Sequence, residues 1–143
     1  MTVASILKTK GTNVVTVQGG SRVIEAVRLL SEHRIGAAIV VSADKGVAGI
    51  FSERDLAKAV AEHGASALDR PVRDLMTTNV RSCRPSDSIE HVMTMMTEGR
   101  FRHLPVIEQG KLLGIVSIGD VVKRRIDAAE MDVEALRQYI AAS

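Results

Sequence analysis

Apolar residues occur along this chain in two kinds of stretch. Short uninterrupted runs rich in β-branched residues predict strands, and some of them are typical of strands covered on both faces. These runs occupy residues 14–17, 37–41, 47–52, 80–83, 104–107 and 112–117. Longer stretches place apolar residues three and four positions apart and predict amphipathic helices. They occupy residues 23–33, 53–63, 89–99 and 118–129, and a last one at 130–142 predicts an additional C-terminal helix.

The order of these elements occurs twice. The segment VAGIFSERDLAK at 47–58 matches LLGIVSIGDVVK at 112–123, and residues 21–41 match residues 87–107. A unit of about 65 residues is near the lower limit of independent stability, so we expect each copy to bury its sheet against the other. We therefore predict an α/β (α+β) fold, with two repeats packed as a pseudo-two-fold pair, each a small three-stranded sheet with two helices. The predicted boundaries are 1–66 for the first domain, 67–129 for the second and 130–143 for the C-terminal helix.

The matched segments place a serine and an aspartate at the start of a predicted helix in each copy. These are Ser52 with Asp55, and Ser117 with Asp120. A hydroxyl, free backbone N–H groups and a carboxylate at one helix N-terminus are suited to holding a phosphate and a sugar diol. Simple helix capping by the same residues is the alternative interpretation. The recurrence of the spacing inside a longer repeat favours a ligand site.

Composition excludes several classes of protein. A hydrophobic content of 45% is enough for a core, and a net charge of +2 is too small to indicate nucleic acid or an anionic membrane. The single cysteine, Cys83, excludes an internal disulfide. No apolar run approaches the ~20 residues of a membrane span, and the N-terminus lacks the pattern of a signal peptide. We therefore expect a soluble cytoplasmic protein.

No arrangement typical of catalysis stands out in the sequence. We find no paired nucleophile and base, no glycine-rich dinucleotide or phosphate loop, and no His, Asp and Glu cluster at metal-ligand spacing. We predict no catalytic residues, no metal site, no catalytic cofactor and no enzymatic activity.

The repeated unit, the HLPVIEQGKLLGIVSIGD run at 103–120 and the DLMT segment at 74–77 resemble the CBS domain family. The resemblance covers almost the whole chain, and two such units in tandem are similar to a CBS pair, or Bateman module. It implies a site for an adenosine-containing ligand: AMP, ADP, ATP, S-adenosylmethionine or NAD(H). It also implies that the aspartate takes the ribose hydroxyls, that the serine approaches the phosphate, and that Ile50 and Ile115 flank the adenine.

The resemblance carries over to further positions. Thr77 lies where the family often offers a hydroxyl to phosphate, and its counterpart in the first copy lies near Lys8. Arg54, beside Asp55, is placed to reach a phosphate. Residues just before the central strand of each copy often touch base or phosphate. Those positions, with their apolar neighbours, are Ile35, Gly36 and Ala37 in the first copy, and Phe101, Arg102 and His103 in the second.

The two predicted clefts differ in charge. Arg100, Arg102 and His103 belong to the same copy as Asp120, and arginine is suited to bidentate phosphate contacts. We therefore hypothesise that both clefts hold adenosine and that the Asp120 cleft, assisted by Lys8, is the better site for AMP.

The resemblance favours a stand-alone sensor module that binds an adenine nucleotide, most favourably AMP. Such a module acts by linkage: the ligand favours one arrangement of the two halves, or of two chains, and a regulated partner responds. The resemblance also implies a homodimer formed through helix faces. A homodimeric interaction module with vestigial clefts is the alternative. Nucleic-acid binding through Arg81, Arg84, Arg100 and Arg102 is a third hypothesis, and the scarcity of aromatic residues argues against it.

Overall fold

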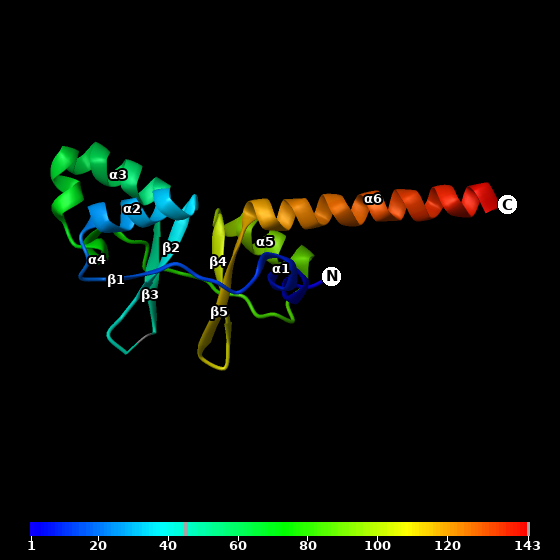
Figure 1. Cartoon of the computed structure of the whole chain (residues 1–143), viewed down its shortest axis with the longest axis horizontal. Helices are drawn as coiled ribbons and strands as arrows, with labels where there is room; N and C mark the ends of the chain where they lie inside the picture. The colour runs from blue at the N-terminus through cyan, green and yellow to red at the C-terminus, as the bar shows by residue number, and fades with distance from the viewer. Residues whose placement is uncertain (45, 143) are drawn as a thin grey trace.

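Two small lobes and one long projecting helix make up the molecule (Figure 1). The structure is a computed structural model, and it describes residues 1–44 and 46–142. In the first lobe, β1 (Thr16–Gln18) pairs parallel with β2 (Ala37–Val41), which pairs antiparallel with β3 (Val47–Ser52). The helical elements of this lobe are α2 (Val23–His33), α3 (Glu53–His63), the 3-10 helix Gly64–Asp69 and α4 (Val72–Leu75).

The second lobe repeats this plan with fewer strand residues. Here β4 (His103–Glu108) pairs antiparallel with β5 (Lys111–Ser117), and α5 (Ile89–Gly99) precedes the hairpin. The helix α6 (Ile118–Ala142) follows it. Two hairpins point the same way and the helices lie on one side of them (Figure 1). The predicted mixed helix and strand fold of two repeats is thus confirmed.

The third strand of the second repeat is shorter than predicted. Residues 80–83 contribute only an isolated parallel bridge, from Cys83 to Val106, which corresponds to the β1–β2 pairing of Val17 with Val40. In the first lobe the Ile39 N–H donates to the Val15 carbonyl at 3.1 Å. Pro105 occupies the equivalent place in β4 and has no N–H to donate. The chain before Cys83 is therefore released from the sheet edge.

The lobes exchange their first helices. Val3, Ile6 and Leu7 of α1 (Val3–Lys10) are buried in the core of the second repeat. Val72 of α4 is buried in the core of the first repeat, where its N–H donates to the Ser21 carbonyl at 2.8 Å. Each spatial lobe is thus completed by a helix that precedes the other repeat in sequence. The domain boundaries at 66/67 and 129/130 stay a prediction.

A small apolar cluster joins the two lobes. Ile39 and Ile50 of the first sheet are buried, and the partly buried Leu112 and Ile115 of β5 pack against them, together with Val80. These contacts place the ends of β3 and β5, where Ser52 and Ser117 lie, near the junction of the lobes. The sequence expectation that each sheet is buried against the other copy accords with this cluster.

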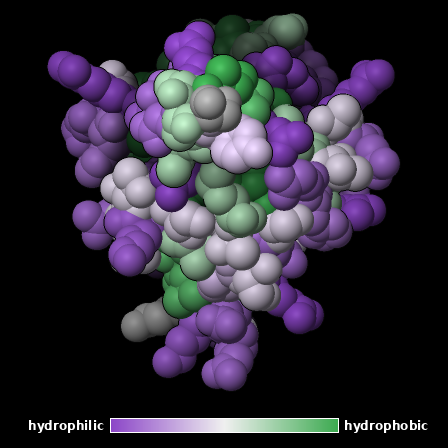
Figure 2. Space-filling view, turned by 90° about the vertical axis from the view of Figure 1, so that its right-hand side faces the viewer, coloured by the Kyte–Doolittle hydropathy of each residue, from purple (hydrophilic) through white to green (hydrophobic). Residues whose placement is uncertain are grey.

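The C-terminal region forms one helix and not two. The separate helix predicted for 130–142 continues directly from the helix that follows β5, so α6 runs unbroken for 25 residues. No Gly or Pro interrupts the sequence between Asp120 and Ala142, which leaves nothing to end the helix near Ala129. Its far half projects beyond the body (Figure 1). In the view from the C-terminal end, hydrophobic and hydrophilic residues lie side by side (Figure 2).

Within the residues described, none of the helices combines the length and apolarity that crossing a bilayer requires.

Candidate functional site

The turn from β3 into α3 forms the first half of the site. Ser52 is the N-cap of α3, and its hydroxyl accepts a hydrogen bond from the Asp55 N–H at 3.3 Å. In return, Asp55 Oδ2 accepts from the Ser52 N–H at 2.9 Å and from the Ser52 hydroxyl at 3.0 Å. This reciprocal capping box fixes the carboxylate at the helix start. Capping, the alternative interpretation for these residues, is therefore one role that they fill.

The Thr77 hydroxyl also forms a hydrogen bond with the Asp55 carboxylate. Its Oγ1 donates to Asp55 Oδ1 at 2.9 Å. Backbone bonds to Ile50, of 3.0 and 2.9 Å in the two directions, hold Thr77 against the edge of β3. The close approach requires Gly49, because a Cβ there would lie 2.5 Å from the Thr77 carbonyl oxygen. The local chain thus positions one carboxylate and two hydroxyls in a partly exposed setting.

A cleft of about 290 Å³ opens beside this group. Its walls come from both lobes, with Ser52, Asp55 and Thr77 on one side and Phe101, Arg102 and His103 on the other. We call it the Asp55 cleft. The remaining residues that line it are Gly36, Ile50, Glu53, Arg54, Asn79, Val80, Arg81, Gly99 and Arg100.

The Asp55 cleft carries an excess of positive charge. Four arginines line it, and only two carboxylates, Glu53 and Asp55, oppose them. The four side chains are those of Arg54, Arg81, Arg100 and Arg102. Across residues 1–44 and 46–142, none of these guanidinium groups takes part in an ion pair. Unneutralised arginines around one cavity attract an anion, and phosphate accepts bidentate hydrogen bonds from them.

His103 lies between the two halves of the molecule. It lines the Asp55 cleft, and its ring lies across from Gly36, where a Cβ would be 3.6 Å from Nε2. Burial lowers the pKa of His103, and the nearby Lys10 charge lowers it further, while Asp120 and Glu53 partly offset this. The imidazole is therefore predominantly neutral at physiological pH. Neutral His103 offers one hydrogen-bond donor and one acceptor to the cleft.

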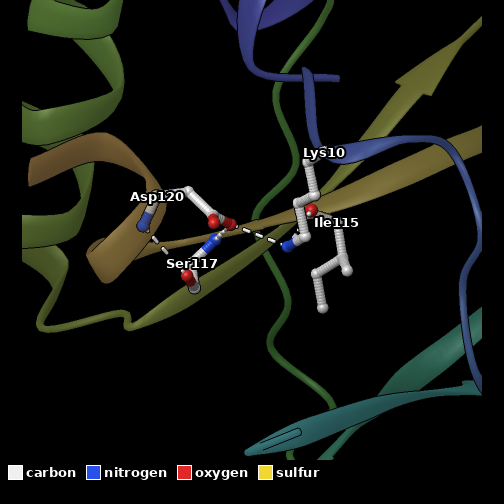
Figure 3. Close-up of polar contacts among 4 residues, drawn as sticks. All are labelled: Lys10, Ile115, Ser117 and Asp120. Atoms are coloured by element: carbon white, nitrogen blue, oxygen red, sulfur yellow. Dashed lines mark hydrogen bonds and ion pairs between the residues drawn. The ribbon is translucent and has the colours of Figure 1, made fainter. Parts of the chain in front are cut away.

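The second copy of the serine and aspartate pair has a different partner. Asp120 Oδ2 accepts from the Ser117 N–H at 2.9 Å, and the Asp120 N–H donates to the Ser117 hydroxyl at 3.2 Å. Lys10 from the end of α1 reaches this turn (Figure 3). Its Nζ lies 2.7 Å from Asp120 Oδ2 and 3.0 Å from the Ile115 carbonyl oxygen. An ammonium of the chain itself thus occupies the place beside the second carboxylate.

The ion pair perturbs the titration of Asp120. Burial of this carboxyl acts to raise its pKa, but the hydrogen bond and charge of Lys10 and the bonds from Ser117 outweigh it. The pKa of Asp120 therefore lies below its usual value. Asp120 is ionised and already paired at neutral pH, whereas Asp55 is bonded only by uncharged donors.

The structure separates the sequence-predicted residues into three groups. The Asp55 cleft brings together Gly36, Ile50, Ser52, Arg54, Asp55, Thr77, Phe101, Arg102 and His103. A second group surrounds Lys10 and comprises Ile115, Ser117 and Asp120. The third group lies outside both: Ile35 packs on the core of the first lobe and Ala37 is buried between the lobes, while Lys8 is exposed on α1.

The premise for ranking the two clefts is wrong. We expected Arg100, Arg102 and His103 to serve the Asp120 cleft because they belong to the same sequence repeat, with Arg102 also able to lean into the Asp55 cleft from the neighbouring copy. The structure instead places all three in the wall of the Asp55 cleft, and His103 also lies close enough to Lys10 and Asp120 for their charges to affect its pKa. The helix α5 ends with Arg100 in the left-handed conformation, at a φ of 56°, and the chain then turns toward the first lobe.

Sequence reasoning missed two cationic residues of this region. Lys10, and not Lys8, meets Asp120, because α1 continues to Lys10 whereas its counterpart α4 ends at Leu75. Arg81 reaches the Asp55 cleft because its segment is released from the sheet edge. The signal for Arg81 was present in the sequence, since Pro105 stands in β4 where the first repeat has Ile39.

Comparisons with known proteins find matches to both repeats of the chain. The family model of the CBS domain matches residues 3–62 and again residues 72–127. The CBS domain-containing protein CBSX3, mitochondrial, of Arabidopsis thaliana is 31% identical over 97% of this chain and 71% of its own length. The crystal structure of a CBS-domain containing protein, ATU1752 from Agrobacterium tumefaciens, is 50% identical with a TM-score of 0.84. That match covers 87% of this chain and 92% of the other.

A more distant solved structure is a complex with a nucleotide. The CBS domain protein PAE2072 from Pyrobaculum aerophilum, complexed with AMP, has a TM-score of 0.75 and is 24% identical. The match covers 84% of this chain and 89% of the other. At this identity the likeness shows a shared fold.

Proposed function

Because the chain belongs to the CBS domain family, we propose that it is a regulatory module that binds one adenine nucleotide, most favourably AMP, in the Asp55 cleft. The observation that carries this proposal is the meeting of a helix-start carboxylate with four arginines in one cavity. A nucleotide needs an acceptor for its sugar hydroxyls and cations for its phosphate, and this cavity offers both.

Each part of AMP has a complementary group in the cleft. Asp55 accepts hydrogen bonds from the ribose hydroxyls, replacing the Thr77 hydroxyl on Oδ1. Thr77 is then released to donate to the phosphate, beside Arg100 and Arg102. The apolar side chain of Ile50 packs against the adenine. The AMP complex of the Pyrobaculum aerophilum protein, which shares this fold, supports an adenosine ligand.

The size of the cleft favours a mononucleotide. Pockets for small molecules range from about 300 to 1,000 Å³, and the Asp55 cleft, at about 290 Å³, lies just below this range. ADP, ATP, S-adenosylmethionine and NAD(H) present larger groups, so we rank them below AMP.

Ligand binding is coupled to the arrangement of the lobes. The cleft is lined from both, with Asp55 in the first and Arg102 in the second, so a nucleotide that contacts both favours the approach of one lobe to the other. A second copy of the chain or a regulated protein then responds to the altered surface. On this proposal the protein is a binding module and not an enzyme, and the cytoplasm stays its predicted compartment.

Isothermal titration of the full chain with AMP tests the proposal. We expect one site per chain, and Arg102→Ala should weaken binding about tenfold or more, because a charge-assisted hydrogen bond to phosphate contributes about 1.5–3 kcal/mol. The matched control is Arg28→Ala, which removes the same charge from an exposed residue of α2 and should leave AMP binding unchanged. Absence of binding by any adenine nucleotide would favour the alternative, an interaction module with vestigial clefts.

A further inference from the structure

We propose that the projecting half of α6 forms a parallel two-stranded coiled coil with α6 of a second copy of this chain. From residue 129 to residue 142 every side chain of the helix is exposed. An isolated helix of this length is marginally stable in water. The projecting half nevertheless continues the helix to Ala142, so we infer that a partner covers its apolar side chains.

Six apolar residues of α6 follow a heptad pattern, and the exposed Met131 and Tyr139 lie outside it. Ile126, Val133 and Ile140 fall at one core position, named a, and Val122, Ala129 and Leu136 fall at the other, named d. The side chains of Ile126, Val133 and Leu136 are 52%, 49% and 58% exposed. Apolar side chains at this spacing form the seam of a coiled coil. In a parallel coiled coil, β-branched residues at a with leucine at d favour two strands, and Leu136 is the leucine among the d residues here.

The surface of α6 is hollowed along this stripe. A shallow groove is lined by Ile126, Ala129, Glu130 and Val133, which lie at successive spacings of three, one and three residues. Four residues with that spacing make the hole that receives one knob of a facing helix. The small side chain of Ala129 leaves room for the knob.

The stripe is distinct from the face of α6 that packs on the body. Val121 is fully buried, whereas its neighbour Val122 is 42% exposed. Arg125 bonds Glu90 of α5 at 2.6 Å and so marks the border between the two faces. A second helix can therefore lie along the stripe without displacing the contacts that α6 makes within the chain.

Charge pattern selects a second copy and its direction. In a parallel pair, Asp132 at position g of one helix meets Arg137 at position e of the other, so the same attraction occurs twice. An antiparallel pair centred on the stripe would bring Asp132 beside Asp132 of its partner, and Arg137 beside Lys123. The helix thus complements itself only when the two copies run in the same direction.

This inference does not depend on the nucleotide. The stripe on α6 shares no residue with the Asp55 cleft, so failure of AMP binding would leave the coiled coil standing, and the reverse also holds.

Disulfide trapping tests the contact in the full chain. Leu136→Cys places thiols of two copies face to face at a d position, so mild oxidation should give a covalent dimer at micromolar concentration. The matched control is Gln138→Cys, two residues away on the outer face, which should cross-link at least tenfold more slowly. Cys83 is buried and provides no background. Equal rates for the two variants, or a parent chain that sediments as a monomer at tens of micromolar, would overturn the proposal.

A charge exchange tests the direction. Arg137→Glu should raise the dimer dissociation constant about tenfold in sedimentation equilibrium, and the double variant Asp132→Lys with Arg137→Glu should restore it to within about threefold of the parent. Failure of the exchange to restore dimerisation contradicts the parallel pairing. A mixture of Ile126→Cys and Leu136→Cys chains gives a second check. If these two variants cross-link with each other faster than two Leu136→Cys chains do, the parallel pairing is also contradicted.

Discussion

The two serine and aspartate turns of this chain share a sequence pattern but meet different partners. Asp55 is bonded by uncharged donors and faces four arginines, whereas Asp120 is paired with Lys10 of the same chain. A repeat therefore does not guarantee two equal sites. The residue that approaches each turn from outside the repeated segment decides which partner the carboxylate has: the Thr77 hydroxyl at Asp55 and the Lys10 ammonium at Asp120.

The energetic contrast between the turns has a simple basis. Displacing Thr77 from Asp55 exchanges one hydroxyl bond for another, so it costs little. Displacing Lys10 from Asp120 breaks an ion pair between side chains that are 36% and 25% exposed. Solvent screens this pair, so the cost stays below about 1 kcal/mol, but it exceeds the cost at Asp55. The chain itself thus weakens AMP binding at the Asp120 turn.

The largest effect should come from the carboxylates. We expect Asp55→Asn to raise the AMP dissociation constant about 10- to 100-fold, because the ribose hydroxyls lose a charged acceptor. Ser52 remains the N-cap and still accepts from the backbone N–H of residue 55, so α3 should persist, which circular dichroism can check. Isothermal titration of Asp120→Asn is the comparison, with an expected change below about threefold. A larger loss in Asp120→Asn would reverse the assignment of the two turns.

Equivalent glycines of the two lobes should differ in their tolerance of a methyl group. At Gly49 a Cβ would meet the Thr77 backbone carbonyl at 2.5 Å, whereas at Gly114 it would meet the tip of the Leu7 side chain at 2.7 Å. The tip of the Leu7 side chain can rotate away, whereas two backbone hydrogen bonds hold Thr77 against Ile50. We expect Gly49→Ala to cost about 2 kcal/mol and Gly114→Ala less than about 1 kcal/mol in urea unfolding. Equal costs would mean that Thr77 is not rigidly held.

Removal of Lys10 should make the two turns more alike. We expect Lys10→Met to free Asp120 and to add a second, weaker AMP site, seen as a rise from one to two ligands per chain. The stability loss should stay below about 1 kcal/mol, because the ammonium is 36% exposed and solvent screens the pair. Lys8→Met is the control and should change neither quantity. Loss of the first site in Lys10→Met would show that this lysine serves the nucleotide directly.

The smallest effect concerns the histidine between the turns. Burial and the Lys10 charge lower the pKa of His103 in the folded chain. As the pH falls, the unfolded chain therefore takes up a proton at this histidine near pH 6.5, before the folded chain does. The resulting stabilisation is present above that pH and is lost as the pH falls through 6.5 toward the folded-state pKa. Urea unfolding at several pH values should show the loss in the parent and in His33→Gln, and a flatter profile in His103→Gln. An unchanged profile in His103→Gln would assign the pH dependence to another group.

Much of the fold was accessible from the sequence. Uninterrupted apolar runs and helical periodicity predicted the two repeats, and the recurrence of Ser and Asp located both helix starts. These features are encoded within a few residues of one another, where local propensity and pattern dominate. The resemblance to the CBS domain family rests on the same short segments and is confirmed by the family match to both copies.

The assignment of side chains to clefts was less accessible, because it depends on packing between the lobes. The exchange of α1 and α4 carries Lys10 to Asp120, and the packing of the two lobes brings Arg100 into the cleft that contains Asp55. Neither arrangement produces a periodic pattern in the sequence near these residues. The extent of α6 is a different case: the predicted separate helix at 130–142 was wrong, although the sequence after Gly119 contains no Gly or Pro that would end the helix.

A crystal structure of the full chain grown with AMP tests the central claim most directly. The account predicts nucleotide in the Asp55 cleft, with the ribose on Asp55, the phosphate beside Arg100 and Arg102, and the Lys10–Asp120 pair intact. Nucleotide bound at Asp120 with Lys10 displaced, and an empty Asp55 cleft, would contradict it.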